Sequence, residues 1–151
     1  FRSRFKEASE FAWLALSVLM KNYFSSAIHN ASDYKIIKNA MHDRYMYEKS
    51  GCIIVVKSDC NSWKQCVKKY ERKFPMEQKA KFIVYRQTDT TWEIRALSDG
   101  TFVNRMNILP ADELKKELSR PSDLVFVHNN AFLAVASTME TCIEIGILSL
   151  H

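Results

Sequence analysis

The sequence contains only three glycines, Gly51, Gly100 and Gly146, and they lie far apart. Phosphate-binding loops need several glycines within a few residues, because the backbone must turn sharply and approach the phosphate closely. Neither a Walker loop nor a dinucleotide-binding fingerprint can be written from three isolated glycines. The sequence therefore excludes, for this chain, the enzyme classes that hold nucleotides on glycine-rich loops.

The composition is that of a single globular domain. The chain has 151 residues, of which 47% are hydrophobic and 26% charged, so it can bury a core of ordinary size. No linker, repeat or low-complexity segment divides it, and we predict one domain over residues 1–151. The first residue is Phe1 rather than Met, which we interpret as the start of a piece of a longer protein.

The N-terminal segment is predicted to form a long helix, because apolar residues recur at three- and four-residue steps from Phe1 to about Asn30. Its most apolar stretch, 11–20, is shorter than the ~20 residues that a membrane span needs. Basic residues precede this stretch, as in a secretory signal, but Glu7 and Glu10 interrupt the pattern. We therefore expect a buried helix rather than a targeting segment, and no membrane association.

The remainder alternates helix and strand signals. A second helix is predicted from a cap at Ser32 or Asp33 to about Arg44, and further helices after Asn61 or Ser62, after Pro110, and after Ser137 or Thr138. Hairpins are predicted for 45–47 with 53–56, for 82–86 with 92–97, and for 124–127 with 131–135. These elements predict an α+β fold: a mostly antiparallel sheet built from hairpins, with flanking helices and a long N-terminal helix.

Catalytic and metal-binding patterns are missing from the sequence. The four histidines stand far apart, and the four cysteines form no Cys-x-x-Cys pair, so we expect reduced, buried thiols and no metal site in this chain. A cysteine nucleophile would need a histidine close to it. We therefore predict no catalytic residue here; the alternative is an enzyme built on Cys66 and His128.

Positive charge is concentrated in one part of the chain. The net charge is +5, yet the stretch 57–86 alone has nine basic and three acidic residues. Such a surface can bind nucleic acid, although a solvated helix face is the alternative. The candidate nucleic-acid-binding residues of this helix are Lys64, Lys68, Lys69, Arg72 and Lys73. The tryptophans Trp13, Trp63 and Trp92 follow apolar patterns and are expected in the core rather than as base-stacking residues.

His128 ends the strand 124–127 and begins a turn with Asn129. We expect this turn to face the start of the last helix near Thr138, where backbone amides can receive an anion. His128, Asn129 and Thr138 are therefore candidate phosphate-binding residues. The alternative is a turn histidine that hydrogen-bonds to its own backbone.

The order of motifs resembles a known family. The segment Leu124-Val125-Phe126-Val127-His128, followed by Phe132-Leu133 and Thr138, is similar to the closing motif of the melanocyte-proliferating-gene exonuclease family, a branch of the DHH phosphoesterases. Upstream, Trp63-Lys64 with Tyr70-Glu71, the segment 82–85 with 92–94, and Phe5 with Ala8 resemble further family motifs in the same order.

The resemblance implies that this chain is the C-terminal half of a larger two-domain protein whose catalytic half is absent. In that family the preceding domain binds divalent metal and cleaves phosphodiesters, and members are mitochondrial and nuclear RNA exonucleases. The chain would then be a substrate-side accessory domain, neither catalytic nor cofactor-binding itself. RNA and the protein's own N-terminal catalytic domain would be its partners, and it would be intracellular, in mitochondria, the nucleus or both.

One departure from the family concerns a loop. Where the family has Gly-Gly-His-Arg-Thr, this chain has Ala134-Val135-Ala136-Ser137-Thr138, so only Thr138 is kept. Side chains at Ala134 and Val135 restrict the close approach that glycine allows. Either direct phosphate binding is lost, or substrate binds elsewhere, for example on the lysine-rich helix. The alternative function is a structural or dimerisation module that buries residues 11–20 against another domain or a second copy.

Overall fold

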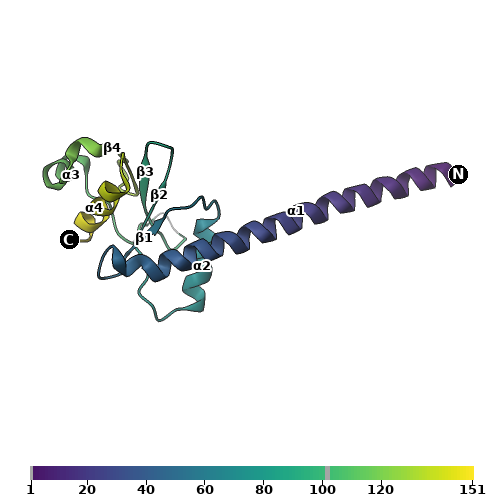
Figure 1. The fold of residues 1–151 in the computed structure, drawn as a ribbon, viewed down its shortest axis with the longest axis horizontal. Helices are drawn as coiled ribbons and strands as arrows, with labels where there is room; N and C mark the ends of the chain where they lie inside the picture. Colours follow the sequence, from purple (N-terminus) through teal and green to yellow (C-terminus); the bar gives the residue numbers. More distant parts are fainter. Residues whose placement is uncertain (1, 101–102) are drawn as a thin grey trace.

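The computed structural model describes residues 2–100 and 103–151 and has an α+β fold (Figure 1). A long helix, α1 (Arg2–Asp43), leads into a domain with a five-stranded mixed sheet in the order β1-β2-β3-β5-β4. The strands are β1 Ile53–Val56, β2 Phe82–Arg86, β3 Trp92–Ala96, β4 Leu124–Val127 and β5 Leu133–Ala136, and the shorter helices are α2 Trp63–Lys73, α3 Ala111–Glu117 and α4 Met139–Leu150. The predicted fold class is therefore confirmed.

The sheet is mostly antiparallel, with one parallel pair. Strands β2 and β3 form the predicted hairpin, and β5 pairs antiparallel with both β3 and β4. Strand β1, however, pairs parallel with β2. Parallel neighbours need a crossover connection rather than a tight turn, and α2 provides it.

The hairpin predicted at 45–47 is wrong, because Arg44–Met46 forms a 3-10 turn. The Arg44 side chain is buried, and its guanidinium donates to the carbonyl of Gln78 at 2.7 Å and to the Tyr45 hydroxyl at 3.0 Å. These bonds fix the turn against the segment that leads into β2. The side chains of Tyr45 and Met46, which suggested a strand, are largely exposed, whereas Tyr47 is half-buried against the core.

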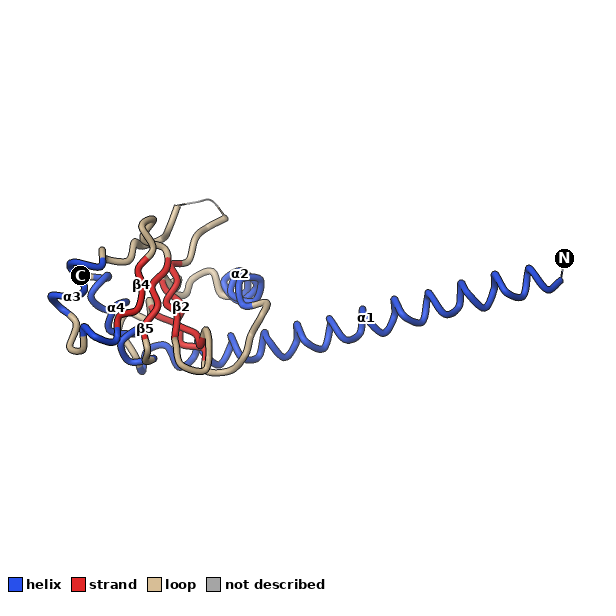
Figure 2. The backbone as a smooth tube through the Cα atoms, turned by 90° about the horizontal axis from the view of Figure 1, so that it is seen from above, coloured by secondary structure: helices blue, strands red, loops and turns tan. Residues whose placement is uncertain are grey.

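Helices cover both faces of the sheet (Figure 2). On one face, α3 and α4 pack over a core that includes Phe82, Val84 and Ile94. On the other face, α2 and the C-terminal part of α1 cover Ile54 and Ile83. Helix α2 turns its predicted apolar side inward, and the inward residues are Cys66, Val67 and Tyr70.

Helix α1 is continuous, so the predicted break near Asp33 does not occur. The Asp33 carboxylate accepts hydrogen bonds from the backbone nitrogen and hydroxyl of Ser62, at 3.1 and 2.6 Å. Asp33 therefore ties α1 to the start of α2 and does not cap a new helix. Ser62 is the N-cap residue of α2, as predicted, but its hydroxyl makes this bond to Asp33 and no capping bond.

The N-terminal part of α1 projects away from the domain (Figure 1), with Phe11 74% and Trp13 72% exposed. The predictions of a buried helix at 11–20 and of a core position for Trp13 are therefore wrong for this chain. The reason is that the domain core reaches only the last turns of α1, through Ile37, Ala40 and Met41. No helix among the described residues is long and apolar enough to span a membrane.

Arg105 links α2 to the loop before α3. Two of its nitrogens donate to the two carboxylate oxygens of Glu71 on α2, at 2.7 and 2.8 Å, and one of them also reaches the carbonyl of Ala80 at 2.8 Å. The side chains of Arg105 and Glu71 are only 10% and 12% exposed. The pKa of Arg105 is raised, chiefly by the hydrogen bond with Glu71. The more exposed Asp99 adds a second carboxylate.

We expect Glu71→Ala to lower the free energy of unfolding by about 3 kcal/mol, because it leaves a nearly buried guanidinium without its main partner. Asp99→Ala removes the 62% exposed partner of the same arginine and should cost less than about 1 kcal/mol. Urea unfolding followed by circular dichroism measures both. Equal losses in the two variants would contradict the structural role assigned to Glu71.

Candidate functional site

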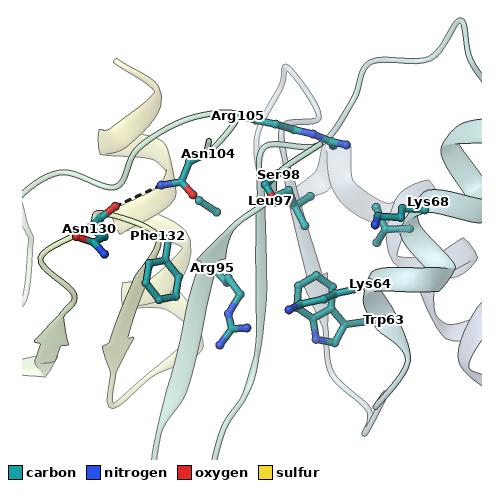
Figure 3. A pocket seen from close by; sticks show the side chains of 12 residues that line it. Trp63, Lys64, Lys68, Arg95, Leu97, Ser98, Asn104, Arg105, Asn130 and Phe132 are labelled. Carbon is teal, nitrogen blue, oxygen red and sulfur yellow. Dashed lines mark hydrogen bonds between the residues drawn. The ribbon is translucent and has the colours of Figure 1, made fainter. Parts of the chain in front are cut away.

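A cleft of about 450 Å³ opens beside α2, over β3 and the turn that precedes β5 (Figure 3). Helix α2 contributes its first turns to one wall, and the β4–β5 connection contributes the other. The side chains that give the cleft its chemistry are Trp63, Lys64, Lys68, Arg95, Asn104, Asn130 and Phe132. The cleft thus combines aromatic rings, cations and amides.

Arg95 comes from β3 and lies between Phe132 and the Trp63–Lys64 pair (Figure 3). One terminal nitrogen donates to Glu93 Oε1 at 3.4 Å, and the guanidinium lies 5.9 Å from the centre of the Phe132 ring. Its Nε is buried and has no hydrogen-bond partner among the described residues. A buried donor without a partner costs about 1–3 kcal/mol, so this guanidinium has hydrogen-bonding capacity to spare.

Glu93 forms an ion pair with Arg95 and positions its guanidinium. The Glu93 side chain is 6% exposed, and that of Arg95 is 28% exposed. The two residues are two positions apart on β3, so their side chains lie on the same face of the sheet. The neighbouring Tyr85 hydroxyl bonds to Glu93; burial first and this bond second raise the pKa of Tyr85. The buried carboxylate therefore has a neutral donor and a cation as partners, and it fixes where the guanidinium lies.

The wall formed by α2 brings an aromatic ring and a cation together. The Trp63 ring lies 5.9 Å from that of Tyr85, and the Lys64 ammonium lies 5.5 Å from the centre of the Trp63 ring. Aromatic faces accept the planar rings of bases, and ammonium and guanidinium groups accept oxyanions. This wall can therefore bind a ligand that has both a ring and a negative charge.

Helix α2 divides the predicted cationic residues between its two sides. Lys64 and Lys68 line the cleft. The ammonium groups of Lys69 and Lys73 lie over the ring of Tyr34 on α1, at 4.3 and 5.1 Å from its centre. Arg72 is exposed. All five remain accessible to a polyanion, but only two belong to the cleft.

His128 lies in the turn between β4 and β5. Its Nδ1 accepts a hydrogen bond from the backbone nitrogen of Asn130 at 3.0 Å, and its ring lies 4.4 Å from that of Phe132. The alternative of a turn histidine bonded to its own backbone is confirmed. Asn129 is exposed in the same turn.

Thr138 lies at the opposite end of the β4–β5 hairpin, about 15 Å along the strand from the turn. It caps α4, as predicted, by accepting a bond from the Thr141 nitrogen at 3.2 Å. The Thr141 hydroxyl donates to the Asp123 carboxylate at 3.0 Å. The expectation that the His128 turn faces this helix start is therefore wrong, and a carboxylate of the chain itself lies there.

Sequence reasoning missed Arg95, Glu93 and Phe132 as site residues. The signal was present in β3, where Glu93 and Arg95 alternate with apolar residues within a sheet otherwise rich in aliphatic side chains. Charged side chains on one face of a central strand indicate that the helices do not fully cover that face of the sheet.

The described residues contain no group of three or more His, Cys, Asp or Glu side chains that could hold a metal ion. Cys66 is buried against α1 and contacts Ser62, whereas His128 packs against Phe132. The structure does not bring this pair together as a nucleophile and base. The cations, amides and aromatic rings that line the cleft can bind a ligand.

The fold and the cleft define an α+β domain that presents cations and aromatic rings beside a mixed sheet. The chain belongs to the MYG1 exonuclease family, described as an uncharacterised protein family (UPF0160), which it matches over residues 1–150. This confirms the family indicated by the motifs and places the chain in a nuclease-related family. Comparisons with curated proteins and with solved structures gave no match.

We expect Thr138→Ala to lower the free energy of unfolding by about 1 kcal/mol, because the first turn of α4 loses its cap. Thr138→Ser keeps the hydroxyl and should restore most of the loss. Thermal or urea unfolding of the three proteins measures this. If serine fails to restore stability, the hydroxyl is not what stabilises the start of α4.

Proposed function

We propose that this chain is the substrate-side domain of a two-domain, metal-dependent exonuclease of the DHH phosphoesterase type, and that it binds RNA. The observation that carries the proposal is the cleft, which places Arg95 and Lys64 beside Trp63 in a chain of a nuclease-related family. The chain is then the C-terminal half, and hydrolysis belongs to an N-terminal catalytic half. A mitochondrial or nuclear location is part of the proposal and is supported by the family resemblance.

The proposal assigns the divalent metal to the catalytic half. The described residues of this chain offer no cluster of metal ligands, so they do not fit such an ion. What they offer is substrate binding: positive charge for the phosphates and aromatic surface for the bases. In this proposal the domain holds RNA in place, and the catalytic half carries out hydrolysis.

The replaced family loop supports binding on the α2 side. Ala134, Val135 and Ala136 are all buried residues of β5, so their side chains pack within the domain. Asp123 lies at the start of α4, where a phosphate would meet a like charge. The α2 surface, by contrast, has five cations within eleven residues.

We expect the full chain to bind single-stranded RNA with an affinity that falls as salt rises. Neutralising Lys69, Arg72 and Lys73 together, each to Gln, should lower the slope of log K against log salt by about 2, because each phosphate contact to a single strand contributes about 0.7. Fluorescence anisotropy across a salt series measures the slope.

A matched control changes three cations at the other end of the domain, Lys115, Lys116 and Arg120, to Gln. These side chains are exposed around α3. The control should leave the slope unchanged. Absence of binding at low salt, or equal effects of the two triple variants, would rule out α2 as the RNA-binding surface.

A structural or dimerisation module is the second candidate, and the exposed apolar part of α1 favours it. Aromatic and aliphatic side chains between Phe5 and Phe24 are half or more exposed. In a helix that is apolar all round, such side chains are normally covered by other elements. Sedimentation of the chain at high concentration tests self-association: a dimer that Leu16→Glu dissociates supports it, and a monomer excludes it.

A further inference from the structure

The guanidinium of Arg95 lines the cleft and has unused hydrogen-bonding capacity. Glu93 and Phe132 occupy two of its sides, and the buried Nε has no partner in the described structure. A guanidinium binds phosphate most strongly through adjacent N–H groups, and the Arg95 side chain, which is 28% exposed, lines the cleft. The neighbouring Lys64 adds a mobile ammonium on the same side.

The aromatic surface next to this cation belongs to Trp63. Tyr85 supports the indole from the sheet, while the indole itself lines the cleft. The ammonium over the Trp63 ring belongs to Lys64, whose exposed side chain can move aside for a planar ligand. At the far end, the amides of Asn104 and Asn130 offer donors and acceptors.

Size restricts what can occupy the cleft. Its volume of about 450 Å³ is in the range of sites that hold one small ligand. We propose that the cleft binds one unpaired nucleotide, with its phosphate on Arg95 and Lys64 and its base against Trp63. This inference rests on the proposed function in that the nucleotide belongs to the bound RNA strand.

Pairing prevents a base from using this site. A base inside a duplex has both faces covered by its neighbours, so it cannot lie against Trp63 without being unstacked. The cleft therefore makes the domain selective for single-stranded segments, whereas the lysines on the other side of α2 contact any phosphate backbone.

The experiment titrates the full chain with adenosine monophosphate, adenosine and inorganic phosphate, each separately. Proton–nitrogen spectra report on the three tryptophan indoles of the chain, and Trp63→Phe identifies the signal of interest. We expect the nucleotide to shift the Trp63 signal and leave those of Trp13 and Trp92 in place. Adenosine and phosphate alone should bind at least about tenfold more weakly, since each makes only one of the two contacts.

Two substitutions test the phosphate contact. Arg95→Gln should weaken nucleotide binding by about tenfold or more, because it removes a charge-assisted pair of bonds. Lys64→Gln should also weaken nucleotide binding. Because Lys64 is exposed, this variant should fold normally, and it tests the phosphate contact even if Arg95→Gln does not fold. Its matched control is Lys115→Gln, an exposed lysine of α3 at the other end of the domain, which should leave nucleotide binding unchanged.

The outcomes separate this inference from the proposed function. If RNA binds through α2 but the nucleotide neither moves the Trp63 signal nor depends on Arg95 or Lys64, the inference is overturned and the proposed function survives. If the nucleotide binds but RNA does not, the cleft is confirmed as a nucleotide site and RNA binding is wrong. Tight binding of phosphate alone identifies a simple anion site and overturns the part assigned to Trp63.

Discussion

The ion pair between Arg105 and Glu71 fixes the position of α2 relative to the sheet. It joins the middle of the helix to the loop after β3, with both side chains almost out of contact with water. Removing either partner leaves the other charge poorly solvated, which is why such pairs hold a structure in one arrangement. The same arginine lines the cleft, so the bond that places the helix also sets the width of the site.

The cleft exists because the helices on this face cover only part of the sheet. Helices α1 and α2 bury the side chains of β1 and β2, while Arg95 on β3 remains open to a ligand. A buried charge must be paired, and the buried Glu93 carboxylate has the Arg95 guanidinium and the Tyr85 hydroxyl as its partners. The residues that line the cleft and the residues of the core therefore occupy neighbouring parts of one face of the sheet.

Most of the fold could be predicted from local patterns. The β2–β3 hairpin, the helix of Trp63 and the Thr138 cap follow from periodicity, turn residues and capping residues, which act over a few positions. The parallel pairing of β1 and the continuity of α1 could not, because they depend on Arg44 and Asp33 bonding to residues more than twenty positions away.

The site was predictable only in part. Charge counting found the lysines of α2, since a run of cations on an amphipathic helix is visible in the sequence. Arg95 belongs to β3 and Phe132 to the turn just before β5, and their meeting depends on the register of β3 with β5. Likewise His128 and Thr138, which the motif placed close together, are separated by the length of a hairpin.

We propose that the domain holds a single RNA strand through one unpaired nucleotide. The most direct measurement compares the affinity of the full chain for an RNA strand with its affinity for the duplex of the same sequence, at one moderate salt concentration. We expect tighter binding of the single strand, and loss of that preference in Arg95→Gln and Lys64→Gln. Equal affinity for both forms, or a preference that survives both substitutions, would contradict it.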